Sequence, residues 1–132
     1  MSIILFKSDL FTVEPGEEIQ PGIYGLRLAK WLEAKLRERG YTVERITEDW
    51  GWCLVLRRKP FMLWVGCSNV YDERWKEDDI PESDELTWQC FAVAEGGWIA
   101  SILGRINKDE AIKELESVLM EIILSEPRIR LV

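Results

Sequence analysis

Thr47-Glu48-Asp49-Trp50-Gly51-Trp52 is the stretch that decides the fold, because two carboxylates lead directly into a Trp-Gly-Trp triplet. The triplet opens the most apolar part of the chain, residues 50–67. Residues two apart in a strand share one face, so we expect Trp50 and Trp52 to lie on the same face. Leu54 and Leu56 continue this face, and Cys53 and Val55 make the other face apolar as well. A strand that is apolar on both faces is covered on both sides, so the pattern predicts an interior strand.

Gly51 and the two acids before it set the edge of this predicted strand. A glycine between two indoles leaves room for a bulge or for the close approach of another backbone. Glu48 and Asp49 would then lie at the rim of the sheet. The simpler interpretation is a core strand with a solvated start. The alternative is a contact site formed by the two acids and one indole, since tryptophan is a common anchor of protein interfaces.

The composition is that of an acidic globular protein. At 132 residues the chain has the length of one domain, and 47% hydrophobic with 31% charged residues is typical of globular proteins. The formal net charge of −7 argues against nucleic acid and anionic membrane surfaces as partners, because both require fields of Lys and Arg. The charge favours a basic partner, or serves solubility alone.

The three cysteines, Cys53, Cys67 and Cys90, all lie in apolar runs. We see no signal-peptide pattern before them and no apolar run of membrane-spanning length. Together these features predict buried, reduced thiols in a cytoplasmic protein. A disulfide from Cys53 to Cys67 across a hairpin is the less favoured alternative. No C-x-x-C pair is present, so neither a zinc site nor thioredoxin-type chemistry is indicated.

The periodicity of apolar residues predicts two helices, over about residues 23–39 and 107–125. Gly40 stands where a glycine ends a helix, and Asn107 is placed to cap the second one. The predicted strands cover residues 3–14, 41–47, 50–57, 61–67, 86–95 and 129–132, the first of them as an edge strand anchored by Phe6 and Phe11.

The order of these elements predicts a single α+β domain over residues 1–132. Short turns between neighbouring strands favour an antiparallel sheet, and helices then gather on one face of it. The expected fold is a two-layer sandwich with an antiparallel sheet of four to six strands and two helices on one face. Because the central strands are apolar on both sides, the second face of the sheet needs tryptophans or a partner to cover it.

Residues 71–85 carry eight acids against two bases, a net charge of −6. Like charges this dense repel one another, so the segment is expected to be a long solvated loop. It is either a solvated surface without a partner or, with its interleaved Tyr71 and Trp75, part of a contact site. The predicted partner-binding residues are Glu48, Asp49, Trp50, Trp52, Asp72, Glu73, Trp75, Asp78, Asp79, Glu82 and Asp84.

The residue types offer little support for catalysis. The chain contains no histidine, which removes Ser-His-Asp and Cys-His catalysis and His-ligated zinc. Carboxylate pairs are unspecific among 24 acids, and the acidic segment lacks the glycine of a calcium-binding loop. No phosphate-binding glycine motif is present. We therefore predict a protein that is not an enzyme, with no catalytic residues, no metal site and no cofactor.

A resemblance to small bacterial single-domain proteins lies in three features. These are a helix ending in glycine, an E-D-W-G-W strand start from Glu48 to Trp52, and a closing amphipathic helix that ends near Pro127-Arg128-Ile129. The likeness spans most of the chain, and only the E-D-W-G-W motif is specific. Such small acidic proteins include immunity-type inhibitors of bacterial toxins. The resemblance implies a protein that neutralises a toxin by occluding its active site.

Two functional hypotheses follow. The first is a non-catalytic protein-binding domain, an acidic inhibitor of the immunity type or an adaptor that docks a basic partner surface, such as that of a toxin. Its acids would steer the encounter and a buried indole would supply affinity. The alternative is a small-ligand-binding or enzymatic domain, with a carboxylate at the mouth of a pocket walled by Trp50, Trp52, Trp64 and Trp88.

Overall fold

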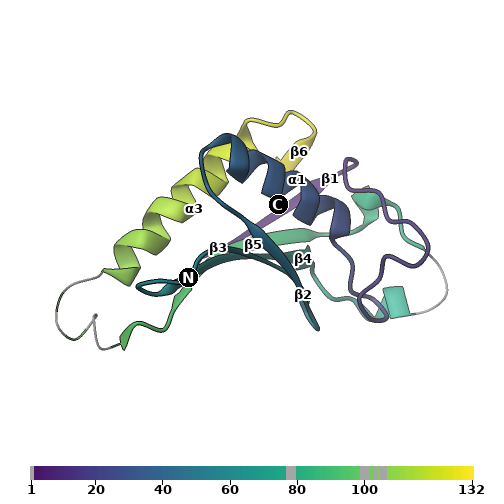
Figure 1. Cartoon of the computed structure of the whole chain (residues 1–132). Helices are drawn as coiled ribbons and strands as arrows, with labels where there is room; N and C mark the ends of the chain where they lie inside the picture. The colour runs from purple at the N-terminus through teal and green to yellow at the C-terminus, as the bar shows by residue number, and fades with distance from the viewer. Residues whose placement is uncertain (1, 77–79, 99–101, 103, 105–106) are drawn as a thin grey trace.

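The computed structural model describes residues 2–76, 80–98, 102, 104 and 107–132. In this part of the chain, six strands form one antiparallel sheet in the order β2-β3-β4-β5-β1-β6. Two helices lie on one side of this sheet (Figure 1). The predicted α+β sandwich, with an antiparallel sheet and two helices on one face, is confirmed.

The strands are β1 (Ile3–Ser8), β2 (Glu44–Glu48), β3 (Gly51–Arg57), β4 (Met62–Asn69), β5 (Trp88–Glu95) and β6 (Ile129–Leu131). The helices are α1 (Leu26–Glu38) and α3 (Lys108–Leu124), and two short 3-10 turns are η1 (Glu73–Lys76) and η2 (Ser83–Glu85).

β1 differs from its prediction in length and in position. It ends at Ser8, and it lies between β5 and β6 because Phe6 stands opposite Trp88 on one side and Leu131 on the other. Phe11 lies beyond the end of the strand and packs edge-on against Trp88, with 5.8 Å between ring centroids. The expected edge position was wrong because the short strand at the end of the chain pairs with this edge.

Apolar stripes at helical spacing fix the two helices to the sheet. Leu28 and Leu32 of α1 are fully buried, as are Leu115, Leu119 and Ile123 of α3. Each such side chain stabilises the fold by roughly 1.5–3 kcal/mol relative to an exposed one. The face of the sheet beneath the helices therefore holds the main core.

Local chemistry sets the helix ends, as the sequence predicted. Gly40, at φ +93°, follows the last turn of α1, where a left-handed residue closes a helix. The Asn107 side chain accepts a hydrogen bond from the Glu110 backbone N–H at 3.0 Å and so caps α3. α1 begins at Leu26, later than expected.

Gly51 makes the close backbone approach that its position predicted. Its φ is +155°, and a Cβ built on it would lie 2.6 Å from the Ser68 Cβ and 2.7 Å from the Cys67 carbonyl oxygen. Real Cβ atoms do not come this close to backbone atoms. The start of β3 therefore fits against the end of β4 only because residue 51 has no side chain.

Trp50 and Trp52 lie on opposite faces of the sheet, so the expectation that they share one face was wrong. Trp50 precedes the strand, which begins at Gly51, and packs against Trp64. Trp52 is partly buried against the main core, with the Arg45 guanidinium 5.5 Å from its ring centroid. The alternation of strand side chains does not extend through Gly51, because its backbone is not that of a regular strand residue.

The three cysteines are free and buried. Cys53 stands opposite Gly66 in the β3–β4 pair, whereas Cys67 stands opposite Cys90 in the β4–β5 pair. The prediction of buried, unpaired thiols is confirmed, and the alternative disulfide from Cys53 to Cys67 is not formed. Cys67 and Cys90 belong to the main core beneath the helices.

The acidic segment 71–85 is only partly solvated. Ser83 is buried, its hydroxyl accepts a hydrogen bond from the Phe11 N–H at 3.0 Å, and it donates one to the Ser8 carbonyl at 2.5 Å. The Trp88 indole N–H donates to the Ser83 carbonyl at 3.0 Å. The expectation of a solvated loop was therefore wrong at Ser83, which fastens the segment to β1 and to the core. Within the described residues, no helix is both long and apolar enough to cross a membrane.

Replacing Gly51 tests the close approach between β3 and β4. We expect Gly51→Ala to lower the free energy of unfolding by about 3 kcal/mol or more, because the new methyl collides with backbone and the positive φ is strained. Gly40→Ala is the control, since its positive φ is strained but nothing lies within 4 Å of the added Cβ. Its expected loss is about 1 kcal/mol. Urea unfolding measures both, and equal losses would contradict the steric argument.

Candidate functional site

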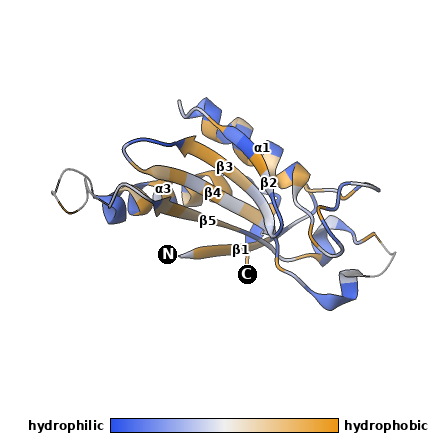
Figure 2. Ribbon diagram, turned by 60° about the horizontal axis from the view of Figure 1, so that its bottom comes forward, coloured by the Kyte–Doolittle hydropathy of each residue, from blue (hydrophilic) through white to orange (hydrophobic). Residues whose placement is uncertain are grey.

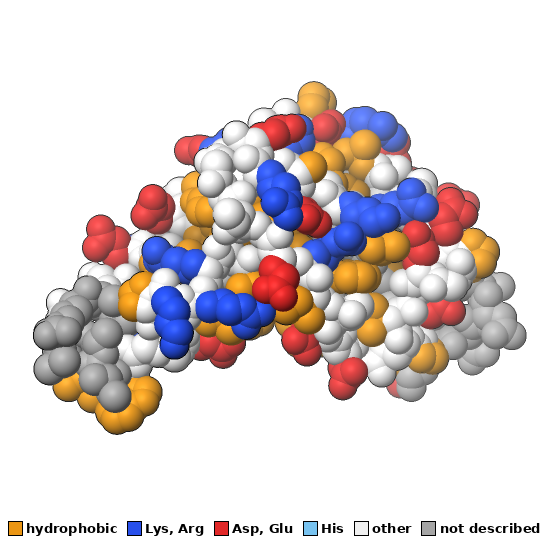
Figure 3. Space-filling view, viewed as in Figure 1, with side chains coloured by type: hydrophobic (Ala, Val, Ile, Leu, Met, Phe, Trp, Pro, Cys, Tyr) orange, Lys and Arg blue, Asp and Glu red, His pale blue; other side chains and the backbone are white. Residues whose placement is uncertain are grey.

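The face of the sheet turned away from the helices is largely apolar. We call it the open face. One row of positions runs across five strands through Ile46, Cys53, Gly66, Phe91 and Ile3, which stand opposite one another in the strand register. Figure 2 turns this side forward and shows apolar stretches on several neighbouring strands. In the space-filling view the lower outline of the molecule, on this side, is hollowed between its two ends (Figure 3).

Three aromatic rings, the aromatic cluster of Trp50, Trp64 and Phe91, pack together at the centre of the open face. The Trp50 ring centroid lies 5.7 Å from those of Trp64 and Phe91, which are themselves 6.1 Å apart. Gly66 makes room for this arrangement, because a Cβ there would collide with the Phe91 ring and lie 3.0 Å from Trp50. Trp50 thus returns from the β2–β3 turn to lie over the middle of the sheet.

Much apolar surface around the cluster is accessible to solvent. Trp50 is 38% exposed, Ile3 51% and Leu5 37%. Five further apolar side chains of this face are half-buried, namely Ile46, Met62, Trp64, Phe91 and Val93. Cys53 and Val55, on the same face, are buried. Single exposed apolar residues are ordinary on a protein surface, but a contiguous group of them marks an interaction site. The open face is therefore the strongest candidate for such a site.

Carboxylates surround the aromatic cluster. Glu95 accepts a hydrogen bond from the Trp64 indole N–H at 3.0 Å. On β2, Glu48 stands opposite Gly51 of β3, and Glu44 forms an ion pair with Arg58 at 2.8 Å. Burial raises the pKa of the Cys53 thiol to about 11, and the negative charges of Glu48, Glu95 and Glu44 contribute to that rise. The three acids therefore all lie close enough to Cys53, on the open face, for their charges to affect its thiol.

The loop at residues 19–24 lies between four of the eight predicted acidic residues. Glu48 and Asp49 lead into the β2–β3 turn, while Asp72 and Glu73 lie at η1. The loop at residues 19–24 joins the two groups. The Gln20 side-chain amide donates to the Asp49 carbonyl at 2.6 Å, and the Tyr24 hydroxyl donates to the Trp75 carbonyl at 3.3 Å.

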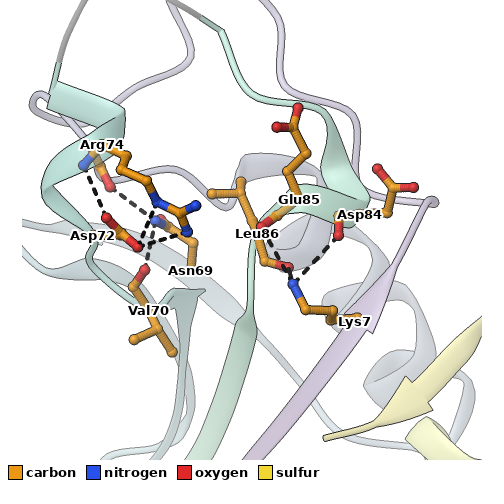
Figure 4. A network of polar contacts seen from close by, with 9 residues as sticks. Lys7, Asn69, Val70, Asp72, Arg74, Asp84, Glu85 and Leu86 are labelled. Atoms are coloured by element: carbon orange, nitrogen blue, oxygen red, sulfur yellow. Dashed lines mark hydrogen bonds and ion pairs between the residues drawn. The ribbon is translucent and has the colours of Figure 1, made fainter.

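Several predicted site residues are engaged in local structure. The Asp72 carboxylate accepts hydrogen bonds from Arg74, which lower the pKa of Asp72 below its usual value (Figure 4). Trp75 is half-buried and packs against the core. Figure 4 also shows Lys7 donating to the carbonyl oxygens of residues 84–86, next to η2.

Glu82 and Asp84, the two predicted acids at η2, are exposed. Asp78 and Asp79 lie outside the described residues. Of the predicted residues, Glu48 and Trp50 belong to the open face directly.

The pocket walled by four tryptophans is not formed. Trp88 is buried in the main core, where it contacts Phe11, and Trp52 is on the same side as the helices. Trp50 and Trp64 lie on the opposite side. A hollow of about 170 Å³ lies elsewhere, between the ends of β3, β4 and α3, and is lined by Tyr41, Arg57 and Glu114 among others.

The sequence prediction missed Phe91, Glu95, Ile3 and Leu5 as parts of a site. The alternation of apolar residues along β5 and β1 was a usable signal, but the face each residue takes depends on strand pairing. Among the residues that the structure describes, no three His, Cys, Asp or Glu side chains are grouped to hold a metal ion.

Comparisons of the chain with known protein families, with curated proteins and with solved structures gave no match.

Removing Trp50 tests whether this indole shields Cys53. At pH 8 we expect all three native thiols to resist Ellman's reagent, because they are buried and their raised pKa values leave little thiolate. Trp50→Ala should make one thiol, Cys53, reactive, since Trp50 covers Gly66 directly opposite it. The control is Trp98→Ala, which removes an indole that is 66% exposed and should expose no thiol. Reaction of all three thiols together in Trp50→Ala would indicate unfolding and contradict the local role of Trp50.

Proposed function

We propose that this protein is a non-catalytic binding domain, an inhibitor of the immunity type or an adaptor, and that it docks a basic partner protein on its open face. The observation that carries the proposal is the aromatic cluster, in which Trp50, Trp64 and Phe91 pack together on a sheet face that remains accessible. Tryptophan and other aromatic residues at the centre of an interface supply a large share of binding energy.

The distribution of charge supports a basic partner. The formal net charge is −7, and Glu48, Glu95 and Asp49 lie on or beside the open face. Complementary charge speeds association and selects among partners more than it adds affinity. In this proposal the apolar centre supplies most of the binding affinity. The surrounding acids supply specificity and raise the association rate.

An inhibitor that acts by occlusion needs a shaped surface and no reactive group. Burial raises the pKa of Cys53 to about 11 and that of Cys90 to about 12, so neither thiol is a nucleophile near neutral pH. The absence of histidine from the sequence removes the usual general base. Both properties support a binding role.

A charge placed on the open face tests the proposal. Tagged protein is used to capture partners from a lysate of the source cell, and the captured protein is then purified for affinity measurements. Leu5→Lys adds a cation to the open face and should weaken binding of a basic partner at least tenfold, as ~1.4 kcal/mol corresponds to tenfold. Leu124→Lys makes the same change at a residue of α3 that is 64% exposed, and it should bind as the native chain does. Equal binding by the two variants would refute docking on the open face.

Two matched double variants test which acids steer the partner. Glu48→Gln/Asp49→Asn neutralises acids beside the open face, whereas Glu82→Gln/Asp84→Asn neutralises two acids at η2. Each changes the net charge equally. We expect the first pair to slow association several-fold at low salt and the second to have a smaller effect, because the interaction of exposed charges is screened over about 10 Å at 0.1 M salt. The association rate of the purified partner with each double variant, measured at low and high salt, shows which pair of acids steers the partner. A larger effect of the η2 pair would place the contact on the acidic segment instead.

A further inference from the structure

We infer that the aromatic cluster and Glu95 form a binding site for an arginine side chain, with the guanidinium over the indoles of Trp50 and Trp64 and paired with the Glu95 carboxylate. The inference rests on the proposed function for the source of the arginine, a partner protein. The site itself is defined by residues of this chain alone.

The protein uses the same combination twice within its own fold. Arg74 lies over the Trp75 ring, with Cζ 5.2 Å from the centroid, and its Nη2 is 2.9 Å from the Asp72 carboxylate. Arg45 lies over the Trp52 ring at 5.5 Å, and its Nε is 3.1 Å from Glu33, an ion pair without hydrogen-bond alignment. In both places an indole and a carboxylate together hold a guanidinium.

Trp64 and Glu95 form a third indole–carboxylate pair, and no cation of the described residues lies over it. The Trp64 indole N–H donates to Glu95 Oε1 at 3.0 Å, which fixes the carboxylate at the edge of the ring. A carboxylate has several acceptor positions, so Glu95 can accept further hydrogen bonds while it holds Trp64. Trp50, whose ring is tilted by 33° to that of Trp64 at a centroid distance of 5.7 Å, enlarges the aromatic surface.

Within the part of the chain that the structure describes, the cations near the open face are engaged or distant. The Lys108 amine donates to the carbonyl of Gly96, the residue after Glu95, at 3.1 Å. Arg58 pairs with Glu44 at 2.8 Å. Lys7 and Arg130 stand opposite each other on β1 and β6, and the Lys7 amine points to backbone carbonyls near η2. Besides burial, the charges that act on the pKa of the Cys53 thiol are three acids, Glu48, Glu95 and Glu44, which raise it, and one base, Arg58, which lowers it. This excess of negative charge favours a cation from outside the chain.

The chemistry of the site favours arginine over lysine. A guanidinium is planar and weakly hydrated, so it stacks on an indole and loses little on leaving water, and its fork of N–H groups matches a carboxylate. An ammonium is a compact, strongly hydrated charge that gains less from an extended aromatic surface. Cation–π attraction is also strongest for tryptophan among the aromatic residues.

Three short peptides test the site without the partner. They are acetyl-Leu-Arg-Leu-amide, its citrulline analogue, which keeps the shape and removes the charge, and its lysine analogue. The indole N–H signals of the native protein are followed by two-dimensional NMR during titration. We expect the arginine peptide to shift the Trp50 and Trp64 indole signals in a saturable way. Binding should be at least tenfold weaker for citrulline and several-fold weaker for lysine.

Glu95→Gln isolates the role of the carboxylate charge. Glutamine keeps an oxygen that accepts the Trp64 hydrogen bond, so the cluster should remain in place, and binding of the arginine peptide should fall at least fivefold. Glu38→Gln, on the exposed side of α1, is the control with the same change of charge and should not alter binding. Equal shifts with arginine and citrulline, an absence of saturation, or unchanged binding in Glu95→Gln would overturn the inference. Equal binding of the lysine peptide would overturn the assignment to arginine.

The outcome is separable from that of the proposed function. If the arginine peptide fails to bind while the Leu5→Lys variant still shows weakened binding of the captured partner, the open face is a docking surface without an arginine site. If the peptide binds as expected while Leu5→Lys and Leu124→Lys both keep the partner, the arginine site exists and the proposed docking mode is wrong.

Discussion

The contact between Gly51 and the end of β4 is the constraint on which the open face depends. The backbone of β3 can start beside Cys67 and Ser68 only because residue 51 lacks a Cβ. The same glycine, at φ +155°, sends Trp50 to one face of the sheet and leaves Trp52 on the other. Gly51 therefore allows the two neighbouring indoles, Trp50 and Trp52, to lie on opposite faces of the sheet.

The two faces of the sheet are covered in different ways. Beneath the helices, leucines at helical spacing fill the main core. On the open face the aromatic cluster lies over Gly66 and leaves neighbouring apolar residues accessible. Exposed apolar surface of this kind favours self-association as well as binding, and a net charge of −7 opposes association between copies through mutual repulsion. The acidic net charge thus opposes self-association through this apolar face.

Indoles in this protein are recurrently combined with carboxylates. At Trp75 and Trp52 the chain completes the combination with its own arginine, and these two rings are partly buried against the core. At Trp64, on the open face, the Glu95 carboxylate accepts a hydrogen bond from the indole itself. The first two arrangements stabilise local structure, since each cation is held by a ring and by an acid of the same chain. The third has the chemistry to do the same for an incoming side chain.

The sequence by itself determined the α+β class, the two helices with their ends at Gly40 and Asn107, the β3–β4 hairpin and the burial of the thiols. These features follow from periodicity, capping chemistry and turn signals that act between residues near in sequence. It also placed Glu48 and Trp50 in the candidate site. Only the tertiary structure decided which face each tryptophan takes, because that depends on the approach of residue 51 to residue 67. It likewise assembled the aromatic cluster from the β2–β3 turn, β4 and β5, and buried Ser83 within an acidic segment. Strand register and contacts between distant segments set these features, and local patterns do not encode them.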